Sequence, residues 1–180
     1  MNVIETPFEG LYVIEPDVFD DNRGYFFESF SRRRYDFLPG DCDFVQDNES
    51  LSRFGVLRGL HYQKNEYAQA KLVRVASGVV RDVVLDLRPQ SSTFGRHFSL
   101  DLSGENKRQL FIPKGFAHGF VTLSEQALFL YKCAGYYVPG SEGSVNALDP
   151  ALGIDWGLEE ERIIRSEKDI LAPMFNEIKL

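Results

Sequence analysis

Short apolar segments alternate with turn residues along almost the whole chain. Apolar, β-branched and aromatic residues dominate the runs LYVIEP, YFFESF, KLVRVAS, VVRDVVLDL, HFSLDLS, QLFIP, GFVTL and ALFLYKCAGYYV. Glycine or proline separates most of these runs, as at Gly55, Gly78 and Pro113. Within residues 72–75 and 98–102 apolar and polar positions alternate, which is typical of half-buried strands. Many short strands with turns between them predict an all-β sandwich, jelly roll or barrel.

Helical patterns are few and short. Residues 29–38, SFSRRRYDFL, predict one short helix with Ser29 or Ser31 as its N-terminal cap. The stretch IIRSEKDILAPMF predicts a second one, capped by Ser166. We find no internal repeat, low-complexity tract or linker. A chain of 180 residues suits one domain, so we expect a single β domain over residues 1–180.

Composition and charge narrow the classes of function. A net charge of −7 argues against general binding of nucleic acid or of an anionic membrane, so a phosphate site would need a local cluster of Arg and Lys. Cys42 and Cys133 form no CxxC motif, and neither a disulfide framework nor a zinc site is indicated. No signal-peptide pattern and no run of about 18 apolar residues is present. We therefore expect a cytoplasmic protein.

The segment RGLHYQ places His61, one of three histidines, near Arg58 and Lys71. A lone histidine on a strand is more often structural than functional. On a regular strand Arg58 and His61 would point to opposite faces, but Gly59 allows a local irregularity between them. Two histidines and a carboxylate could also converge on a metal ion. The histidines are isolated and form no HxH motif, which argues against a metal site.

Three further segments carry candidate chemistry. His118 lies among small residues in FIPKGFAHGFVTL, which fits either a ligand site or a tight hairpin with a buried histidine. In FLYKCAGYY, Tyr131, Tyr136 and Tyr137 could pack, donate a proton to an enolate or stack on a nucleobase, and their spacing does not decide among these roles. Asp169 in SEKD belongs to a solvated charge run unless it reaches a histidine, where it would fix the tautomer.

Together, VLRGLHYQ, AQAKLVRV, ENKRQLFIPKGFAHGFVTLSE, FLYK, DPALGIDW and SEKD resemble the dTDP-4-dehydrorhamnose 3,5-epimerases of deoxysugar biosynthesis in order and spacing. The resemblance implies a cupin-like jelly roll, a double-sheet barrel with a few short helices, that needs no metal or other cofactor. It also implies a homodimer with exchanged N-terminal strands. The substrate would be a thymidine-diphosphate 4-keto-6-deoxy sugar, namely dTDP-4-keto-6-deoxyglucose, and the product its 4-keto-L-rhamnose isomer.

The same resemblance implies catalytic roles. Carbons 3 and 5 of the sugar flank the ketone at carbon 4, so removal of either proton gives an enolate. His61 is similar to the family's base and Asp169 to the carboxylate that orients it. Tyr131 is similar to the acid on the far face of the sugar, and Lys71 to a lysine near the developing enolate. Cationic neighbours would favour the neutral imidazole of His61.

Binding residues are also implied by the resemblance. Contacts with the sugar or nucleotide would come from Arg23, Glu28, Gln46, Asp47, Asn48, Arg58, His118, Glu142 and Lys168. Tyr137 would stack on thymine, and Phe19 and Phe26 would wall the nucleotide pocket. Arginine suits a diphosphate because its planar fork binds two oxygens at once. On an exchanged segment, Arg23 would reach the partner subunit's site.

The sequence departs from the family pattern at three places. Ala134-Gly135 replaces a usual Thr-Asp pair, Phe111 replaces a Trp, and SVNALDP lacks the Trp that usually precedes Asp-Pro. These changes leave open a monofunctional 3- or 5-epimerase that acts on a related 4-keto-6-deoxy sugar nucleotide. Two other classes are a metal-dependent cupin oxygenase and a sugar-nucleotide binding module without catalysis. The retained His61, Asp169 and Tyr131 argue against the binding module.

Overall fold

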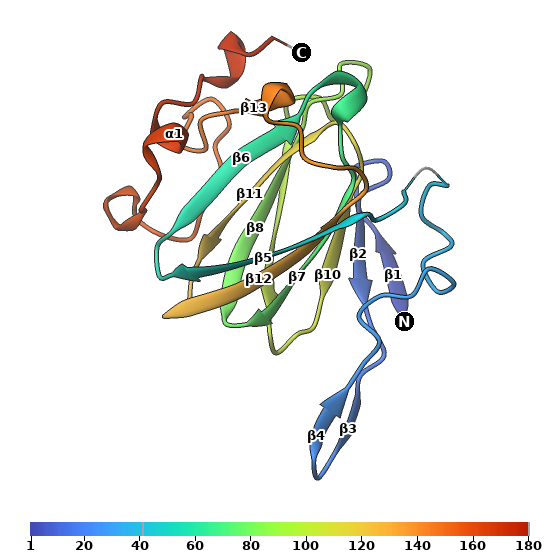
Figure 1. Cartoon of the computed structure of the whole chain (residues 1–180). Helices are drawn as coiled ribbons and strands as arrows, with labels where there is room; N and C mark the ends of the chain where they lie inside the picture. The colour runs from blue at the N-terminus through green and yellow to red at the C-terminus, as the bar shows by residue number, and fades with distance from the viewer. Residues whose placement is uncertain (41, 180) are drawn as a thin grey trace.

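Two antiparallel β-sheets face each other across the core of the computed structural model, which describes residues 1–40 and 42–179 (Figure 1). The six-stranded sheet has the order β1 (Asn2–Glu5), β2 (Tyr12–Glu15), β10 (Gln109–Ile112), β7 (Lys71–Ser77), β12 (Gln126–Cys133) and β5 (Gln46–Arg53). The five-stranded sheet has the order β13 (Glu142–Ser144), β6 (Leu57–Gln63), β11 (Phe116–Thr122), β8 (Val79–Asp86) and β9 (His97–Ser103). The prediction of an all-β, double-sheet fold is confirmed, although the described strands do not close into a barrel.

Helical elements are short throughout the described residues. They are η1 (Asn65–Tyr67), η2 (Pro139–Ser141), η3 (Glu160–Arg162), α1 (Glu167–Ile170) and η4 (Phe175–Glu177). The predicted cap of α1 is confirmed, because the backbone N–H of Asp169 donates to Ser166 Oγ. The helix predicted over 29–38 is wrong: residues 32–37 form turns. Tyr35 and Leu38 in this segment are buried against the outer face of the six-stranded sheet, and this packing overrides the local helical preference.

The core between the sheets is built from alternate positions of neighbouring strands. Val73 and Val75 of β7 and Phe129 of β12 pack against Val80 and Val84 of β8. All five side chains are 2% exposed or less. Each buried side chain of this size stabilises the fold by about 1.5–3 kcal/mol relative to an exposed one. Because side chains alternate between the two faces of a strand, the same alternation also determines which polar side chains of these strands point inward.

A second apolar layer covers the outer face of the five-stranded sheet. The chain after β13 forms this layer, in which the single tryptophan, Trp156, is 3% exposed and packs with Leu60 of β6 and Val83 of β8. The indole Nε1 of Trp156 donates to the carbonyl oxygen of Ala147. This C-terminal layer leads into α1 and thereby places α1 beside β6 (Figure 1).

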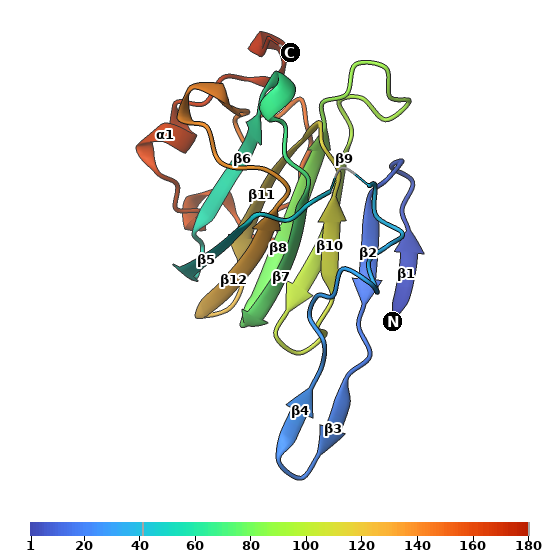
Figure 2. The same ribbon diagram turned by 45° about the vertical axis from the view of Figure 1, so that its right-hand side comes forward.

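The strands β3 (Phe19–Asp21) and β4 (Gly24–Phe26) form a hairpin that projects beyond both sheets (Figures 1 and 2). Its aromatic side chains are exposed, with Phe19 at 63% and Phe26 at 70%. The Arg23 guanidinium pairs with Asp21 of the same hairpin. Exposed aromatic area of this kind on one projecting element is typical of an interaction site.

A buried carboxylate closes the end of β8. Asp86 has no exposed area, and its oxygens accept hydrogen bonds from Arg88, Ser91 and Thr93. Burial alone would raise the pKa of Asp86, but the hydrogen bonds from Arg88, Thr93 and Ser91 outweigh it and lower the pKa to about 2. The carboxylate therefore holds the loop that follows β8.

This network predicts a component of acid stability. A pKa that falls from 3.8 to about 2 on folding adds roughly 2 kcal/mol above pH 4, and this stability is lost as the pH falls from about 4 to about 2. We expect Asp86→Asn to lower the free energy of unfolding at neutral pH and to flatten its pH dependence in this window. Urea titrations from pH 2 to pH 7 measure both. Asp36→Asn, at an exposed site, is the matched control. Equal pH dependence in wild type and Asp86→Asn would contradict the assignment.

Candidate active site

A cavity of about 510 Å³ lies between the two sheets at one end of the sandwich. Strands β5, β6, β7, β11 and β12 and the helix α1 contribute to its wall. A second cavity of about 340 Å³ adjoins it, and both are lined by His61, Lys71 and Tyr131. The structure therefore brings three of the four predicted catalytic residues to the junction of the two cavities. Asp169, the fourth, lines the larger one.

His61 is held by Asp169, which lies 108 positions further along the chain. Nε2 of His61 is 2.6 Å from Oδ1 of Asp169, whose side chain is only 5% exposed. Burial alone would raise the pKa of Asp169, but its hydrogen bond with His61 and the nearby charges hold that pKa below its usual value. An ionised Asp169 accepts a hydrogen bond from the N–H group at Nε2 of His61. In this tautomer Nδ1 of His61 carries no proton. Arg58 and Lys71 line the same cavity, but the direct partner of His61 is this carboxylate.

The close approach of β6 and β11 shapes this wall. His118 pairs with His61, and the register then shifts, so that Phe120 pairs with Arg58. At Gly59, whose φ is +130°, an added Cβ would lie 2.6 Å from the Cα of Gly119. The irregularity expected at Gly59 is therefore present, and it lets Arg58 and His61 line one cavity.

Lys71 and Tyr131 lie on the opposite wall, on β7 and β12 of the six-stranded sheet. Burial and the charge of Cys133 raise the pKa of Tyr131, against a smaller opposing effect of Arg58, so the phenol keeps its proton. Burial lowers the pKa of Lys71, while the charges of Cys133, Asp82 and Glu142 oppose this effect. The imidazole of His61 on one sheet thus faces a phenol and an amine on the other sheet.

The smaller cavity carries the residues expected to bind the nucleotide. The hydroxyl of Tyr137 donates to Glu142 Oε2 at 2.7 Å, and the Lys168 ammonium lies 2.5 Å from the other oxygen of Glu142. Gln46 and Asn48 point inward from β5, and Oε1 of Gln46 accepts from the backbone N–H of Tyr137. The structure brings these predicted binding residues together around one entrance.

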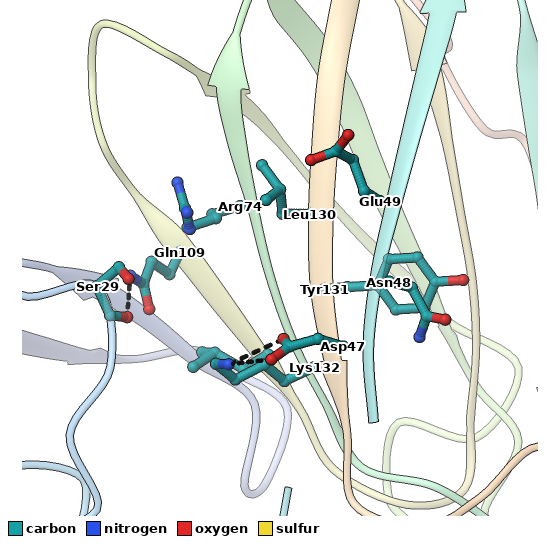
Figure 3. Close-up of a pocket in the computed structure, with 10 residues that line it drawn as sticks. Ser29, Asp47, Asn48, Glu49, Arg74, Gln109, Leu130, Tyr131 and Lys132 are labelled. Carbon is teal, nitrogen blue, oxygen red and sulfur yellow. Dashed lines mark hydrogen bonds and ion pairs between the residues drawn. The ribbon is translucent and has the colours of Figure 1, made fainter. Parts of the chain in front are cut away.

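Asp47 does not face this site. It lies between Gln46 and Asn48 on β5, so strand alternation directs its side chain to the outer face of the six-stranded sheet. There Lys132 Nζ donates to both carboxylate oxygens of Asp47 at 2.8 Å, in a groove that Arg74, Gln109 and Leu130 also line (Figure 3). Any contact of residue 47 with a ligand in the cavity would therefore come from its backbone.

Four other predicted binding residues lie on or just after the projecting hairpin. They are Phe19, Arg23, Phe26 and Glu28. None of them lines the two cavities of its own chain. The side chain of Arg23 is 85% exposed.

Sequence analysis missed a second histidine–carboxylate pair. His118, predicted only as a binding residue, has its Nε2 at 2.9 Å from Oδ2 of Asp82, a fully buried residue of β8. The signal was the Asp that interrupts the apolar run VVRDVVLDL. Ser50, Phe120, Phe129 and Arg165 also line the larger cavity and were not predicted.

The described residues, 1–40 and 42–179, show neither a metal-ligand cluster nor a membrane-spanning helix. They contain no group of three or more His, Cys, Asp or Glu side chains arranged to hold a metal ion. No helix among them has the length and apolar character needed to cross a membrane.

Comparison with known proteins identifies the family. The family described as dTDP-4-dehydrorhamnose 3,5-epimerase matches residues 5–177. The Salmonella typhimurium protein of that name is 51% identical over 181 residues, which cover 100% of this chain and 98% of that protein. The chain therefore belongs to the dTDP-4-dehydrorhamnose 3,5-epimerase family, and it is an enzyme of the isomerase class.

Solved structures agree in fold. The Legionella pneumophila dTDP-6-deoxy-D-glucose-3,5-epimerase, solved with dTDP-4-keto-L-rhamnose, superposes with a TM-score of 0.94 at 52% identity, over 99% of this chain and 94% of that one. A 3'-monoepimerase from Streptomyces bikiniensis, solved with dTDP-quinovose, is more distant, with 33% identity and a TM-score of 0.86 over 94% of this chain and 85% of that one. The cupin-like jelly-roll prediction is confirmed by this likeness.

The contact between β6 and β11 yields a prediction about the site. Gly59→Ala should destabilise the protein by about 1–3 kcal/mol and displace His61, because the new Cβ would meet Gly119 and the carbonyl oxygen of His118 at 2.9 Å. Urea denaturation and turnover measure the two effects. Gly40→Ala, where nothing lies within 4 Å of the added Cβ, is the matched control. A Gly59→Ala enzyme as stable and active as the control would contradict this account.

Proposed function

We propose that the protein epimerises carbons 3 and 5 of dTDP-4-dehydro-6-deoxy-D-glucose to give dTDP-4-dehydro-L-rhamnose. The observation that carries the proposal is the placement of His61 and Tyr131 on opposite walls of one cavity, with Lys71 between the two cavities. Inversion of a carbon requires a proton to leave from one face and to return to the other. A base and an acid on facing sheets meet this requirement.

The steps follow from the chemistry of the ketone. Nδ1 of His61 takes the proton from carbon 3 or 5, and the electron pair moves onto the oxygen at carbon 4. The ammonium of Lys71 stabilises this enolate, an effect worth roughly 3 kcal/mol of barrier at comparable sites. Tyr131 then returns a proton to the opposite face. The electron pair never leaves the substrate, so the reaction needs no redox partner, and we infer that no cofactor takes part.

The nucleotide end of the substrate fits the smaller cavity. Tyr137 is 49% exposed and presents a ring on which thymine can stack, while Glu142 holds its hydroxyl. Arg58 and Lys168 supply the local positive charge that an acidic chain needs for a diphosphate. A pathway that makes sugar nucleotides fits a cytoplasmic location, which we propose as well.

The alternative is epimerisation at one carbon only. Identities of 51% and 52% to proteins named as 3,5-epimerases, against 33% to a 3'-monoepimerase, favour the double reaction. Gly135 adjoins the smaller cavity through Gln69, which lines this cavity and donates to the carbonyl oxygen of Gly135. Ala134 packs in the apolar cluster on the outer face of the six-stranded sheet. Neither Ala134 nor Gly135 lines the cavities that contain His61, so we propose that these departures affect substrate choice rather than proton transfer.

Deuterium exchange tests the reaction. With dTDP-4-keto-6-deoxyglucose in deuterated water, we expect proton NMR to show deuterium at carbons 3 and 5 and the L-configured product after trapping with a reductase. His61→Asn should lower the exchange rate about 100- to 10,000-fold. The Tyr131→Phe enzyme should still exchange the proton at carbon 5 for deuterium but should fail to invert this carbon. The substitution keeps the ring in place and removes only the hydroxyl group that would donate the proton.

Each outcome decides one point. Exchange at a single carbon would establish a monoepimerase. Normal product stereochemistry from Tyr131→Phe would remove Tyr131 as the acid. Tight binding without exchange by the wild-type protein would favour the non-catalytic binding module. No stoichiometric metal in the purified protein, together with full activity in chelator, would exclude the metal-dependent cupin oxygenase.

We also propose that the active unit is a homodimer with exchanged N-terminal strands. The support is the hairpin β3–β4, which projects away from its own sandwich with Phe19 and Phe26 exposed and Arg23 pointing to solvent. A hairpin of this shape buries its aromatic side chains only against a second chain. Seated near a neighbour's cavity, Arg23 would add positive charge for the diphosphate.

Mixing of two inactive variants tests the shared site. If Arg23 serves the partner's cavity, Arg23→Ala and His61→Asn homodimers are both impaired, but their heterodimer contains one intact site. After subunit exchange at equal amounts, we expect activity from about one quarter of all sites. A His61→Asn and Tyr131→Phe mixture is the control, because both changes affect the same chain's cavity wall and each heterodimer site keeps one defect. No recovery in an exchanged Arg23→Ala mixture would contradict the shared site.

A further inference from the structure

Asp82 is a buried carboxylate beneath the active site. It lies on β8 between Val80 and Val84, whose side chains belong to the apolar core, and it has no exposed area. Its Oδ2 accepts from Nε2 of His118, which is itself 7% exposed. Its other oxygen, Oδ1, is buried and accepts no hydrogen bond from any described residue. The apolar face of β8 is therefore interrupted by a carboxylate with one partner.

Stability does not explain this carboxylate. Asp86, four residues further along β8, is equally buried, but Arg88, Ser91 and Thr93 satisfy its oxygens. Asp82 lacks such a set, and a buried polar atom without a partner destabilises a fold. Apolar residues of similar volume often replace buried charged pairs without loss of stability. A role in the site explains the retained charge better.

Asp82 interacts with two residues of the site, His118 and Lys71. His118 faces the cavity next to His61, its cross-strand neighbour, and its Nε2 is bound to Asp82. This bond orients the ring and presents Nδ1 to the cavity. Lys71 faces the same cavity, and strand alternation turns both Asp82 and Lys71 into the space between the sheets, in line with the core residues Val84 and Val73. Burial lowers the pKa of the Lys71 ammonium group, and the charges of Cys133, Asp82 and Glu142 oppose this effect.

We propose that Asp82 is the buried counter-ion of the active site: it positions the His118 ring and stabilises positive charge on Lys71 where this residue faces the sugar. This inference rests on the proposed enolate mechanism. Asp82 contacts no substrate atom, so it is a positioning residue that acts through His118 and Lys71.

Other charged and titratable groups line the two cavities together with Lys71. They are Arg58, His61 and Tyr62 of β6, His118 of β11, Tyr131 and Cys133 of β12, Tyr137, Glu142 of β13, Arg165, and Lys168 and Asp169 of α1. Glu142 is engaged by Tyr137 and Lys168, and Asp169 by His61, so these carboxylates already have partners. Asp82 differs from them in that its Oδ1 is fully buried and has no hydrogen-bond partner among the described residues.

The test is Asp82→Asn, which removes the charge but keeps the shape and an acceptor for His118. We expect kcat for deuterium exchange to fall about 10- to 100-fold at neutral pH, with KM within about twofold, because an interaction specific to the enolate is weakened. The basic limb of the kcat profile should move to lower pH by about one unit, because Lys71 loses its proton more easily. The melting temperature should not fall.

A second readout does not depend on turnover. Lysines of the intact protein are reductively methylated with a ¹³C label, and the Lys71 signal is assigned from its absence in Lys71→Arg. We expect this signal to titrate at lower pH in Asp82→Asn than in wild type. Asp101→Asn on β9 is the matched control, because it removes the same charge from a carboxylate outside the cavity that pairs with Arg81.

The outcomes separate this inference from the function on which it rests. A wild-type enzyme that exchanges no proton overturns the proposed function, while the Lys71 titration still tests Asp82. An active wild type with the same pH profile and the same Lys71 titration in Asp82→Asn overturns the inference. If Asp82→Asn does not fold, Asp82→Ser replaces it. Failure of both variants to fold shows that Asp82 is structural and also overturns the proposal.

Discussion

The two-residue period of a β-strand is the constraint on which this molecule depends. Alternate side chains of β7 and β12 enclose the core, so continuing the same face along each strand carries Lys71 and Tyr131 into the space between the sheets. The site is thus the polar end of the core. Its geometry depends on the packing of Val73, Val75 and Phe129, which fixes the distance between the walls.

The two walls are made from different kinds of connection. Tyr131 and Lys71 come from adjacent strands of one sheet, whereas His61 depends on a contact with Asp169, which the C-terminal layer places beside β6. Ser166 caps the short α1 and fixes the backbone of Asp169. A one-turn helix has little stability of its own. The packing of Trp156 and its neighbours therefore supports the orientation of His61.

Much of this could be predicted from the sequence, for local reasons. The strands follow from alternation, and the Ser166 cap follows from local chemistry. The structure of residues 29–38 could not be predicted in this way, because Tyr35 and Leu38 pack against a sheet formed by residues distant in the sequence. Asp47 was grouped with its neighbours by resemblance, although alternation sends its side chain to the other face. Asp82 was overlooked although it interrupts the apolar run VVRDVVLDL, because its partner His118 lies 36 positions further along the chain and only the fold brings the two together.

Trp156 has a practical consequence. As the single indole, it lies behind β6 in the layer that carries α1, away from the hairpin β3–β4. Fluorescence excited at wavelengths that spare tyrosine therefore reports the environment of this layer alone. A blue-shifted emission, which is typical of a dry indole, would persist while the hairpin changes partners and would be lost when the C-terminal layer detaches. Fluorescence of one natural chromophore thus distinguishes detachment of the layer near His61 from changes in the hairpin at the opposite end of the molecule.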